Sequence, residues 1–303
     1  MRLVEVIETG DVLGECPLWS IDEGRLWWTD IQSRRLRRLD PKTRKIEDFA
    51  APERVGAFAF VEGRPGVLLT AFETGLAMFE PASGKLDWVV RPETLGSGRR
   101  FNDGRTDRQG RFWIGTMVED EARAGAASAA VWRLDADGSL TAQIEGVRIS
   151  NGLCTSPDGK TLYFADSLSG VMEAYDLDPQ TGAISGKRLF AEVGRGGPDG
   201  STVDAEGRVW SARWGAGEVV CLSPDGRELE VVHLPVVQPT CVAFGGEGLK
   251  LMFVTTASDG LTAAERAAQP LAGAIFIYQS DVPGLAEVAY RSSATAALGA
   301  RGG

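Results

Sequence analysis

Apolar and polar positions recur in one repeating block along most of the chain. Each block has an acidic or polar turn, a glycine, an aromatic-rich apolar run and a second apolar run. Clear copies begin at SIDEGRLWWTD (20–30), TDRQGRFWIGT (106–116), SPDGKTLYFAD (156–166) and VDAEGRVWSAR (203–213). The glycines of all six copies lie 41 to 49 residues apart: Gly24, Gly66, Gly110, Gly159, Gly207 and Gly248. Periods of this length, with several short strands each, are typical of propeller blades.

The repeat predicts an all-β fold, a six-bladed β-propeller. We expect a single domain over residues 1–303, with a flexible tail at about 292–303. Aromatic residues after the glycine should pack between blades, because large rings bury much area there. This core role is expected for Trp28, Trp113 and Trp210. The segment 260–270 predicts a short helix that ends at Pro270, and the Ala/Gly-rich insertion 118–130 predicts a loop over one face.

Composition narrows the partners of the protein. The net charge of −10 argues against a nucleic-acid backbone or an anionic membrane as a partner. No apolar run approaches the length of a membrane span, and the first residues do not resemble a signal peptide. The four cysteines are widely spread, which is typical of a reduced protein with free thiols. We therefore expect a cytoplasmic protein, either a monomer or a small homo-oligomer.

Four polar side chains occupy matching phases of the repeat. Asn102, Asn151 and Asp199 each lie eight residues before the glycine of their copy, and Glu15 lies nine before. Equivalent positions in successive blades lie at equivalent distances from the propeller axis, so these oxygens should meet at one end of the central channel. Asn and Asp before glycine are also common turn formers. Four residues in phase, one of them a glutamate, favour a shared site.

Oxygen donors that converge in a narrow channel make a site for a hard cation. The two carboxylates would balance a divalent charge, and without a cation they would repel each other. The donor type favours Ca²⁺, with Mg²⁺, Mn²⁺, Zn²⁺ or Fe²⁺ as alternatives. Chemistry based on several histidines is excluded, because His233 is the one histidine in the chain. No GxSxG or phosphate-loop motif is present.

The sequence resembles the senescence-marker-protein/gluconolactonase family, which includes regucalcin and sugar lactonases. The resemblance rests on GECPLW, RFNDG, GTM, ISNGL, SPDGKTLYFAD, PDGSTVDAEGRVW and QPLAGAIF, from residue 14 to about 277. It implies one divalent metal held by Glu15, Asn151 and Asp199. It also implies that Arg100 and Asn102 bind substrate hydroxyls. Members of the family commonly have a glutamate three residues after the GTM methionine, and Asp120 takes that place here, between two glutamates.

The activity implied by the resemblance is hydrolysis of an aldonolactone, of gluconate, arabinonate, xylonate or galactonate type, to its aldonic acid. Asp199 would accept a proton from the attacking water. Two other functions fit the same cation site. One is a phosphotriesterase-like hydrolase, although Arg100 and Asn102 favour a sugar. The other is a calcium-binding propeller without enzymatic activity.

Overall fold

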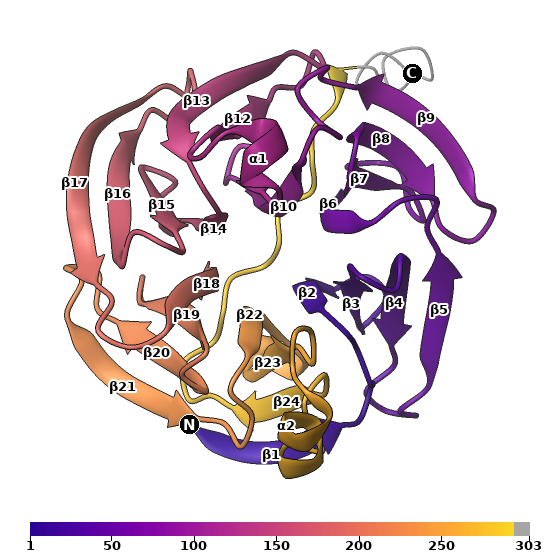
Figure 1. The fold of residues 1–303 in the computed structure, drawn as a ribbon, viewed down its shortest axis with the longest axis vertical. Coiled ribbons are helices and arrows are strands. Elements are labelled where there is room, and N and C mark those ends of the chain that lie inside the picture. The colour runs from indigo at the N-terminus through magenta and orange to yellow at the C-terminus, as the bar shows by residue number, and fades with distance from the viewer. Residues whose placement is uncertain (294–303) are drawn as a thin grey trace.

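The computed structural model describes residues 1–293 and consists of six four-stranded antiparallel sheets arranged in a ring (Figure 1). Blade 1 consists of β2 (Gly14–Ser20), β3 (Arg25–Asp30), β4 (Arg35–Leu39) and β5 (Ile46–Ala50). Blade 2 consists of β6 (Val55–Phe60), β7 (Leu68–Phe72), β8 (Gly75–Glu80) and β9 (Lys85–Val90). Blade 3 consists of β10 (Arg99–Thr106), β11 (Phe112–Val118), β12 (Ala129–Leu134) and β13 (Leu140–Val147). The predicted all-β, six-bladed propeller is confirmed.

Blades 4 to 6 continue around the ring. Blade 4 consists of β14 (Ser150–Thr155), β15 (Thr161–Asp166), β16 (Val171–Leu177) and β17 (Ile184–Glu192). Blade 5 consists of β18 (Gly197–Val203), β19 (Val209–Trp214), β20 (Glu218–Leu222) and β21 (Glu228–His233). Blade 6 consists of β22 (Pro239–Gly245), β23 (Leu251–Thr256), β24 (Ile275–Gln279) and β1 (Arg2–Ile7). In each blade the first strand lies nearest the axis and the fourth lies outermost (Figure 1).

Blade 6 is completed by the N-terminal strand. β1 pairs with β24 in a register that runs from Arg2 opposite Gln279 to Ile7 opposite Ile275. The two ends of the ring are thereby joined by backbone hydrogen bonds. The repeat did not predict this closure, because residues 2–7 contain none of the turn and glycine signals that mark the other strands.

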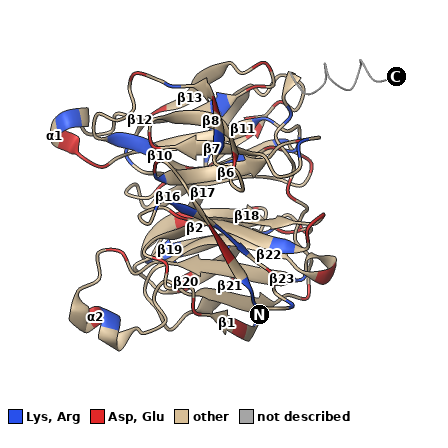
Figure 2. Ribbon diagram, turned by 90° about the vertical axis from the view of Figure 1, so that its right-hand side faces the viewer, with Lys and Arg blue, Asp and Glu red and all other residues tan. Residues whose placement is uncertain are grey.

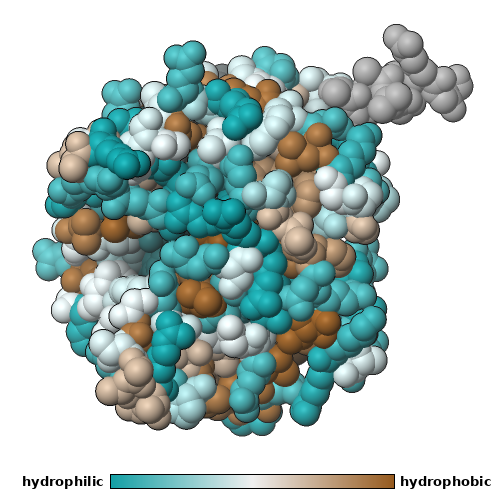
Figure 3. Space-filling model, turned by 45° about the vertical axis from the view of Figure 1, so that its right-hand side comes forward, coloured by the Kyte–Doolittle hydropathy of each residue, from teal (hydrophilic) through white to brown (hydrophobic). Residues whose placement is uncertain are grey.

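The core lies between neighbouring blades, where aromatic rings pack face to face or edge to face. Trp19 of blade 1 stacks on Phe253 of blade 6 with ring centroids 5.7 Å apart, and Trp210 of blade 5 meets the edge of Phe244 of blade 6 at 6.2 Å. The three tryptophans expected in the core are each at most 1% exposed, which confirms that expectation: Trp28, Trp113 and Trp210. The outer surface carries only scattered apolar side chains among polar ones (Figure 3).

The shared sequence Asp-x-x-Gly-Arg-x-Trp explains why the hairpins of blades 3 and 5 are so regular. Asp107 is fully buried and accepts hydrogen bonds from two backbone N–H groups of its turn, from Arg111 Nε at 2.7 Å and from Trp113 Nε1 at 3.0 Å. Asp204 makes the same set in blade 5, with Trp210 Nε1 at 2.8 Å. Hydrogen bonds from this many donors compensate the cost of burying the carboxylate. The motif therefore fixes both the conformation of the turn and the position of the tryptophan ring.

The helices project from one face of the disc (Figure 2). The predicted helix within 260–270 is α2 (Ala263–Ala268), which starts at a capping box between Thr262 and Glu265. The predicted loop 118–130 contains a short helix, α1 (Glu121–Ala124). A single 3₁₀ turn, η1 (Glu247–Leu249), completes the described helices. Among residues 1–293, no helix has both the length and the apolar character needed to cross a bilayer.

The segment after β24 crosses the opposite end of the channel (Figure 1). Tyr290 exchanges backbone hydrogen bonds with Phe60 and Glu62 of blade 2 at 2.7 and 3.0 Å. Glu287 forms a buried ion pair with Arg105, which lies near the end of β10, at 3.4 Å. This end of the channel is therefore covered. Of the expected tail, residues 294–303 lie outside the described residues, and Ser293 donates its backbone N–H to Ala136 O at 2.7 Å.

Candidate metal and substrate site

The four polar residues predicted from the repeat lie where the innermost strands depart from regular pairing. Register shifts occur at Asn102 in β10 and Asp199 in β18, and directly after Glu15 in β2 and Asn151 in β14. A β-bulge re-aims side chains and is common near functional sites. The innermost strands of blades 2 and 6 have a similar shift, so it is a feature of all six blades, and in four of them it re-aims a polar side chain.

Backbone conformation at these bulges is also unusual. Cys16, next to Glu15, has φ +48°, and Gly152, next to Asn151, has φ +68°. A left-handed conformation is easy for glycine and costly for most other residues. At Gly200 the constraint is space, because a Cβ there would lie 2.3 Å from Cys241 Sγ of blade 6. The inner strands thus approach one another closely around the channel.

A chain of hydrogen bonds connects blades 3, 4 and 5 at this end. Arg100 Nη1 donates to Asn102 Oδ1 at 2.8 Å, and Asn102 Nδ2 donates to Asn151 Oδ1 at 3.2 Å. Asn151 Nδ2 donates to Ser167 Oγ at 2.8 Å, and Ser167 donates in turn to the carbonyl of Pro198, next to Asp199, at 2.8 Å. An amide can present either its oxygen or its nitrogen. Since Nδ2 of Asn151 donates to Ser167, its Oδ1 faces Asn102 and is the atom that could bind a cation.

The carboxylates of this region are buried together. Burial raises the pKa of Glu15 to about 8, and the neighbouring charge of Asp103 adds to the rise. Burial, then the charges of Glu15 and Asp103, raise the pKa of Asp199 well above its ordinary value. Burial also raises the pKa of Asp103 to about 6. The charge of Glu15 acts on Asp199, and the charge of Asp103 acts on both, which indicates that these carboxylates from blades 1, 3 and 5 share one region.

The donor set fits a hard divalent cation. Within residues 1–293, neither Glu15 nor Asp199 forms an ion pair with a lysine or arginine, and the charge of Arg100, which lowers the pKa of both, does not outweigh their burial. Buried charges are normally paired or bound to metals. In the same residues, no three Cys, His, Asp or Glu side chains form a metal-binding group. A cation held here would therefore depend on the amide oxygen of Asn151 as well as on the two carboxylates.

Glu119 and Asp120 differ sharply in what they contact. Asp120 caps α1, where its Oδ1 accepts from the backbone N–H groups of Ala122 and Arg123, and its side chain is 45% exposed. Glu119 instead accepts from Arg100 Nε at 2.9 Å. The structure thus brings Arg100, Asn102, Asn151 and Asp199 together and places Asp120 at the start of the neighbouring helix.

Three residues at this end escaped the repeat pattern. Asp103 follows Asn102 in the bulge, and its Oδ2 accepts from Leu153 N at 2.8 Å. Glu119 could have been distinguished from Asp120, because Asp before Glu-Ala-Arg is a helix-capping signal. Ser167 had no sequence signal at all, since it follows β15 in an ordinary polar turn.

Other reactive groups do not form a second catalytic centre among the described residues. All four cysteines are free and buried, and burial raises the pKa of the Cys154 thiol to about 12. His233 is three-quarters exposed on β21 and lies 3.6 Å from Glu218. The expectations of free thiols and of no histidine-based site are consistent with this placement.

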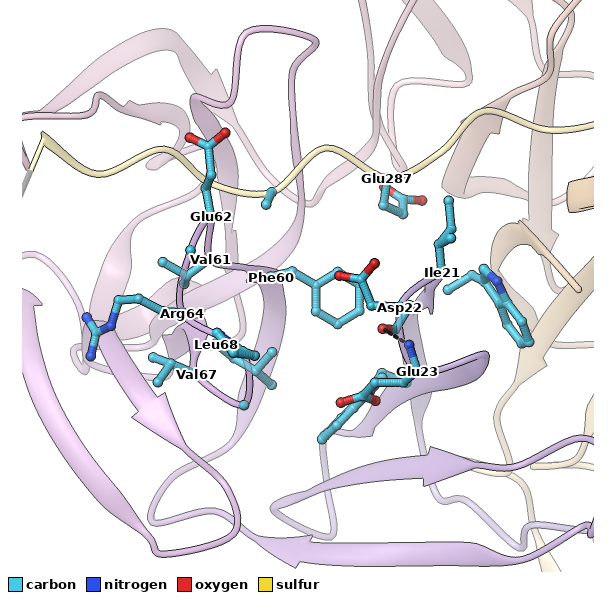
Figure 4. Close-up of a pocket in the computed structure, with 17 residues that line it drawn as sticks. Ile21, Asp22, Glu23, Phe60, Val61, Glu62, Arg64, Val67, Leu68 and Glu287 are labelled. Carbon is cyan, nitrogen blue, oxygen red and sulfur yellow. Dashed lines mark hydrogen bonds between the residues drawn. The ribbon is translucent and has the colours of Figure 1, made fainter. Parts of the chain in front are cut away.

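A cleft of about 520 Å³ lies elsewhere (Figure 4). It is a cleft between blades 1 and 2, where Phe60, Val61 and Leu68 face Ile21 and Asp22. Its walls come from the ends of β2 and β6 and from the segment that contains Glu287, so it lies at the covered end of the channel. It contains none of the predicted site residues.

The propeller is a hydrolase of the class that acts on carboxylic esters, because its relatives are named as lactonases. The chain belongs to the SMP-30/gluconolactonase/LRE-like family, whose model matches residues 13–258.

Relatives match nearly the whole chain. The 6-deoxy-6-sulfogluconolactonase of Pseudomonas putida is 39% identical over 93% of this chain and 96% of its own. The pentonolactonase of Haloferax volcanii is 38% identical over 91% and 94%. A crystal structure of regucalcin from Agrobacterium tumefaciens, described as a calcium-binding protein, superposes with a TM-score of 0.89 at 33% identity, covering 95% of this chain and 98% of that one. The resemblance predicted from the sequence motifs is confirmed.

Proposed function

We propose that the protein hydrolyses a sugar-derived aldonolactone to its aldonic acid with the help of one divalent cation. The observation that carries the proposal is the buried pair Glu15 and Asp199, which forms no ion pair among the described residues; Asp199 is connected to Asn151 through Ser167 and the carbonyl of Pro198. Glu15, Asn151 and Asp199 would hold the cation. The relatives named as sugar lactonases support the reaction type.

Ca²⁺ is the cation that this oxygen-only donor set favours. When bound, a divalent cation supplies positive charge that polarises a carbonyl oxygen and lowers the pKa of bound water. The neighbour described as calcium-binding supports the choice of metal. Zn²⁺, Mn²⁺, Mg²⁺ and Fe²⁺ are the alternatives that a reconstitution experiment would compare.

The side chains of the protein would transfer the proton and bind the substrate. Asp199 accepts a proton from the attacking water, whose oxygen forms the new bond to the lactone carbonyl carbon. The ring C–O bond breaks, and its oxygen takes a proton to become the hydroxyl of the aldonic acid. Arg100 and Asn102 hold the sugar hydroxyls, because their polar groups lie at the open end of the channel next to the proposed cation ligands.

Asp120 is proposed as the contact with the sugar from the insertion. It lies one residue beyond the Glu119 that binds Arg100, and its side chain reaches solvent. The variant D120N should raise KM while leaving kcat within about twofold, since asparagine can still cap α1 and the change removes the carboxylate charge. An unchanged KM would remove Asp120 from the substrate site.

The central test is a lactone panel on protein stripped with a chelator and reloaded with Ca²⁺, Mg²⁺, Mn²⁺, Zn²⁺ or Fe²⁺. The panel should contain hexono-, pentono- and sulfonated lactones, with acid release followed by pH. The variant D199A should lose cation binding in calorimetry and at least about 10³-fold in kcat, while its circular dichroism stays that of the wild type. D281N, which removes an exposed carboxylate, is the matched control.

Three results would contradict the proposal in different ways. Wild-type turnover by D199A would exclude the catalytic and metal roles of Asp199. Cleavage of phosphotriesters but not lactones would favour the phosphotriesterase-like alternative. Tight Ca²⁺ binding without opening of any lactone would favour a binding protein.

A further inference from the structure

An ion-pair network lies beside the substrate end of the channel and joins blade 2 to blade 3. Arg54, which precedes β6, binds Glu73 through Nε at 3.0 Å and Nη2 at 2.8 Å. It also binds both carboxylate oxygens of Glu119, at 2.8 and 2.7 Å. Arg54 is only 18% exposed, and two-pronged pairs of this kind fix geometry as well as charge. Glu119 is thus held from a neighbouring blade.

Glu119 in turn holds Arg100. Nε of Arg100 donates to Glu119, and Nη1 donates to Asn102 Oδ1 and to Phe101 O. Nη2 of Arg100 donates to no described residue, although the side chain is only 4% exposed. The network therefore commits two nitrogens of the guanidinium and leaves the third for a ligand.

The charges in the network support one another. Burial opposes ionisation of Glu119, but hydrogen bonds from Arg54 and the charge of Arg100 outweigh it and lower its pKa. Hydrogen bonds that Arg54 donates to Glu73 and Glu119 raise the pKa of Arg54. Arg54 thus stays charged, and so does the carboxylate that it positions.

We propose that Arg54 is a positioning residue for the substrate-binding Arg100. Anchored by Glu73, it fixes the Glu119 carboxylate, and Glu119 orients the Arg100 guanidinium so that Nη2 points to the sugar. This inference rests on the proposed lactonase function, because the substrate of Arg100 is the sugar of that proposal. Arg54 itself touches no proposed cation ligand.

Kinetics of the Ca²⁺-loaded protein on a hydrolysed lactone test this role. R54M should raise KM about tenfold or more, since small misplacements of a binding group weaken substrate capture, while kcat changes less than about threefold. R54K should recover part of the loss, because a lysine restores one of the two ion pairs. R91M is the matched control: Arg91 lies at the same rim, donates to Thr74 and is 54% exposed. It removes the same charge without touching Glu119 and should leave KM unchanged.

A double-mutant cycle tests whether the effect of R54M on KM is transmitted through Arg100. If Arg54 acts through Arg100, R54M should change KM less than about twofold in an R100M background. Equal effects of R54M in both backgrounds, or an equal rise of KM in R91M, would overturn the proposal.

A second readout does not need activity. Crystals of R54M should show Arg100 Nε separated from Glu119, and an unchanged Arg100–Glu119 pair would overturn the positioning role. Failure of the lactonase proposal is distinguishable, because it would show as a wild-type protein that opens no lactone with any cation.

Discussion

The two ends of the central channel differ in how their buried charged side chains are paired. At the covered end, Arg105 and Glu287 are both more than nine-tenths buried and neutralise each other at 3.4 Å. At the open end, Glu15 and Asp199 are also buried and form no ion pair among the described residues, and their pKa values are raised although the charge of Arg100 lowers both. A buried ion pair completes itself, whereas a buried pair of like charges requires a ligand of the opposite sign. The ion pair at the covered end therefore indicates a role in stability, and the like-charged pair at the open end indicates a binding site.

Removing one partner at the covered end should give the largest effect on stability. E287A leaves Arg105 buried without its counter-charge, which typically costs 3–5 kcal/mol, so we expect about 3 kcal/mol less free energy of unfolding in urea. E62A is the control, because Glu62 pairs with Arg291 at 3.4 Å with both side chains more than half exposed. It should cost less than about 1 kcal/mol. Equal losses for both variants would show that the Arg105–Glu287 pair does not fasten the crossing segment.

Adding a cation should give the next largest effect, and at the open end only. At a Ca²⁺ concentration about a hundredfold above Kd, binding should raise the free energy of unfolding by about 2.7 kcal/mol. The gain should disappear in D199A and persist in E287A, as judged by urea titration with and without a chelator. Stabilisation of D199A by the same Ca²⁺ concentration would locate the cation elsewhere.

The smallest expected effect comes from Ser167, which orients Asn151. S167A removes the acceptor of Asn151 Nδ2, so the amide is no longer held in the orientation that leaves its oxygen for a cation. Ca²⁺ affinity in calorimetry should fall about tenfold, which corresponds to about 1.4 kcal/mol. S169A, two residues further along in an exposed turn, should bind Ca²⁺ like the wild type. Wild-type affinity in S167A would mean that the strand alone orients Asn151.

Sequence reasoning reached the blade count and the phase of the oxygen donors because both follow from local repetition. The turn and glycine signals recur in every blade, and Glu15, Asn102, Asn151 and Asp199 keep one phase relative to them. Their side chains meet because equivalent strands surround one axis.

The parts that sequence reasoning missed depend on contacts between distant segments. The Arg54–Glu119 pair joins two blades, the Glu287 segment crosses the channel, and β1 pairs with the last blade. None of these leaves a periodic signal. Spacing from the GTM methionine does not show where β11 ends and where the cap of α1 begins. It therefore could not tell which of Glu119 and Asp120 contacts Arg100.

The pairing of β1 with β24 has a consequence for biosynthesis. Residues 2–7 leave the ribosome long before residues 275–279, so the outer edge of blade 6 must wait for its partner strand. Until then the circle is open between blades 6 and 1, and Glu15 stands on the blade at its free edge. Full affinity for the proposed cation should therefore arise only near the end of translation, when β1 has paired with β24.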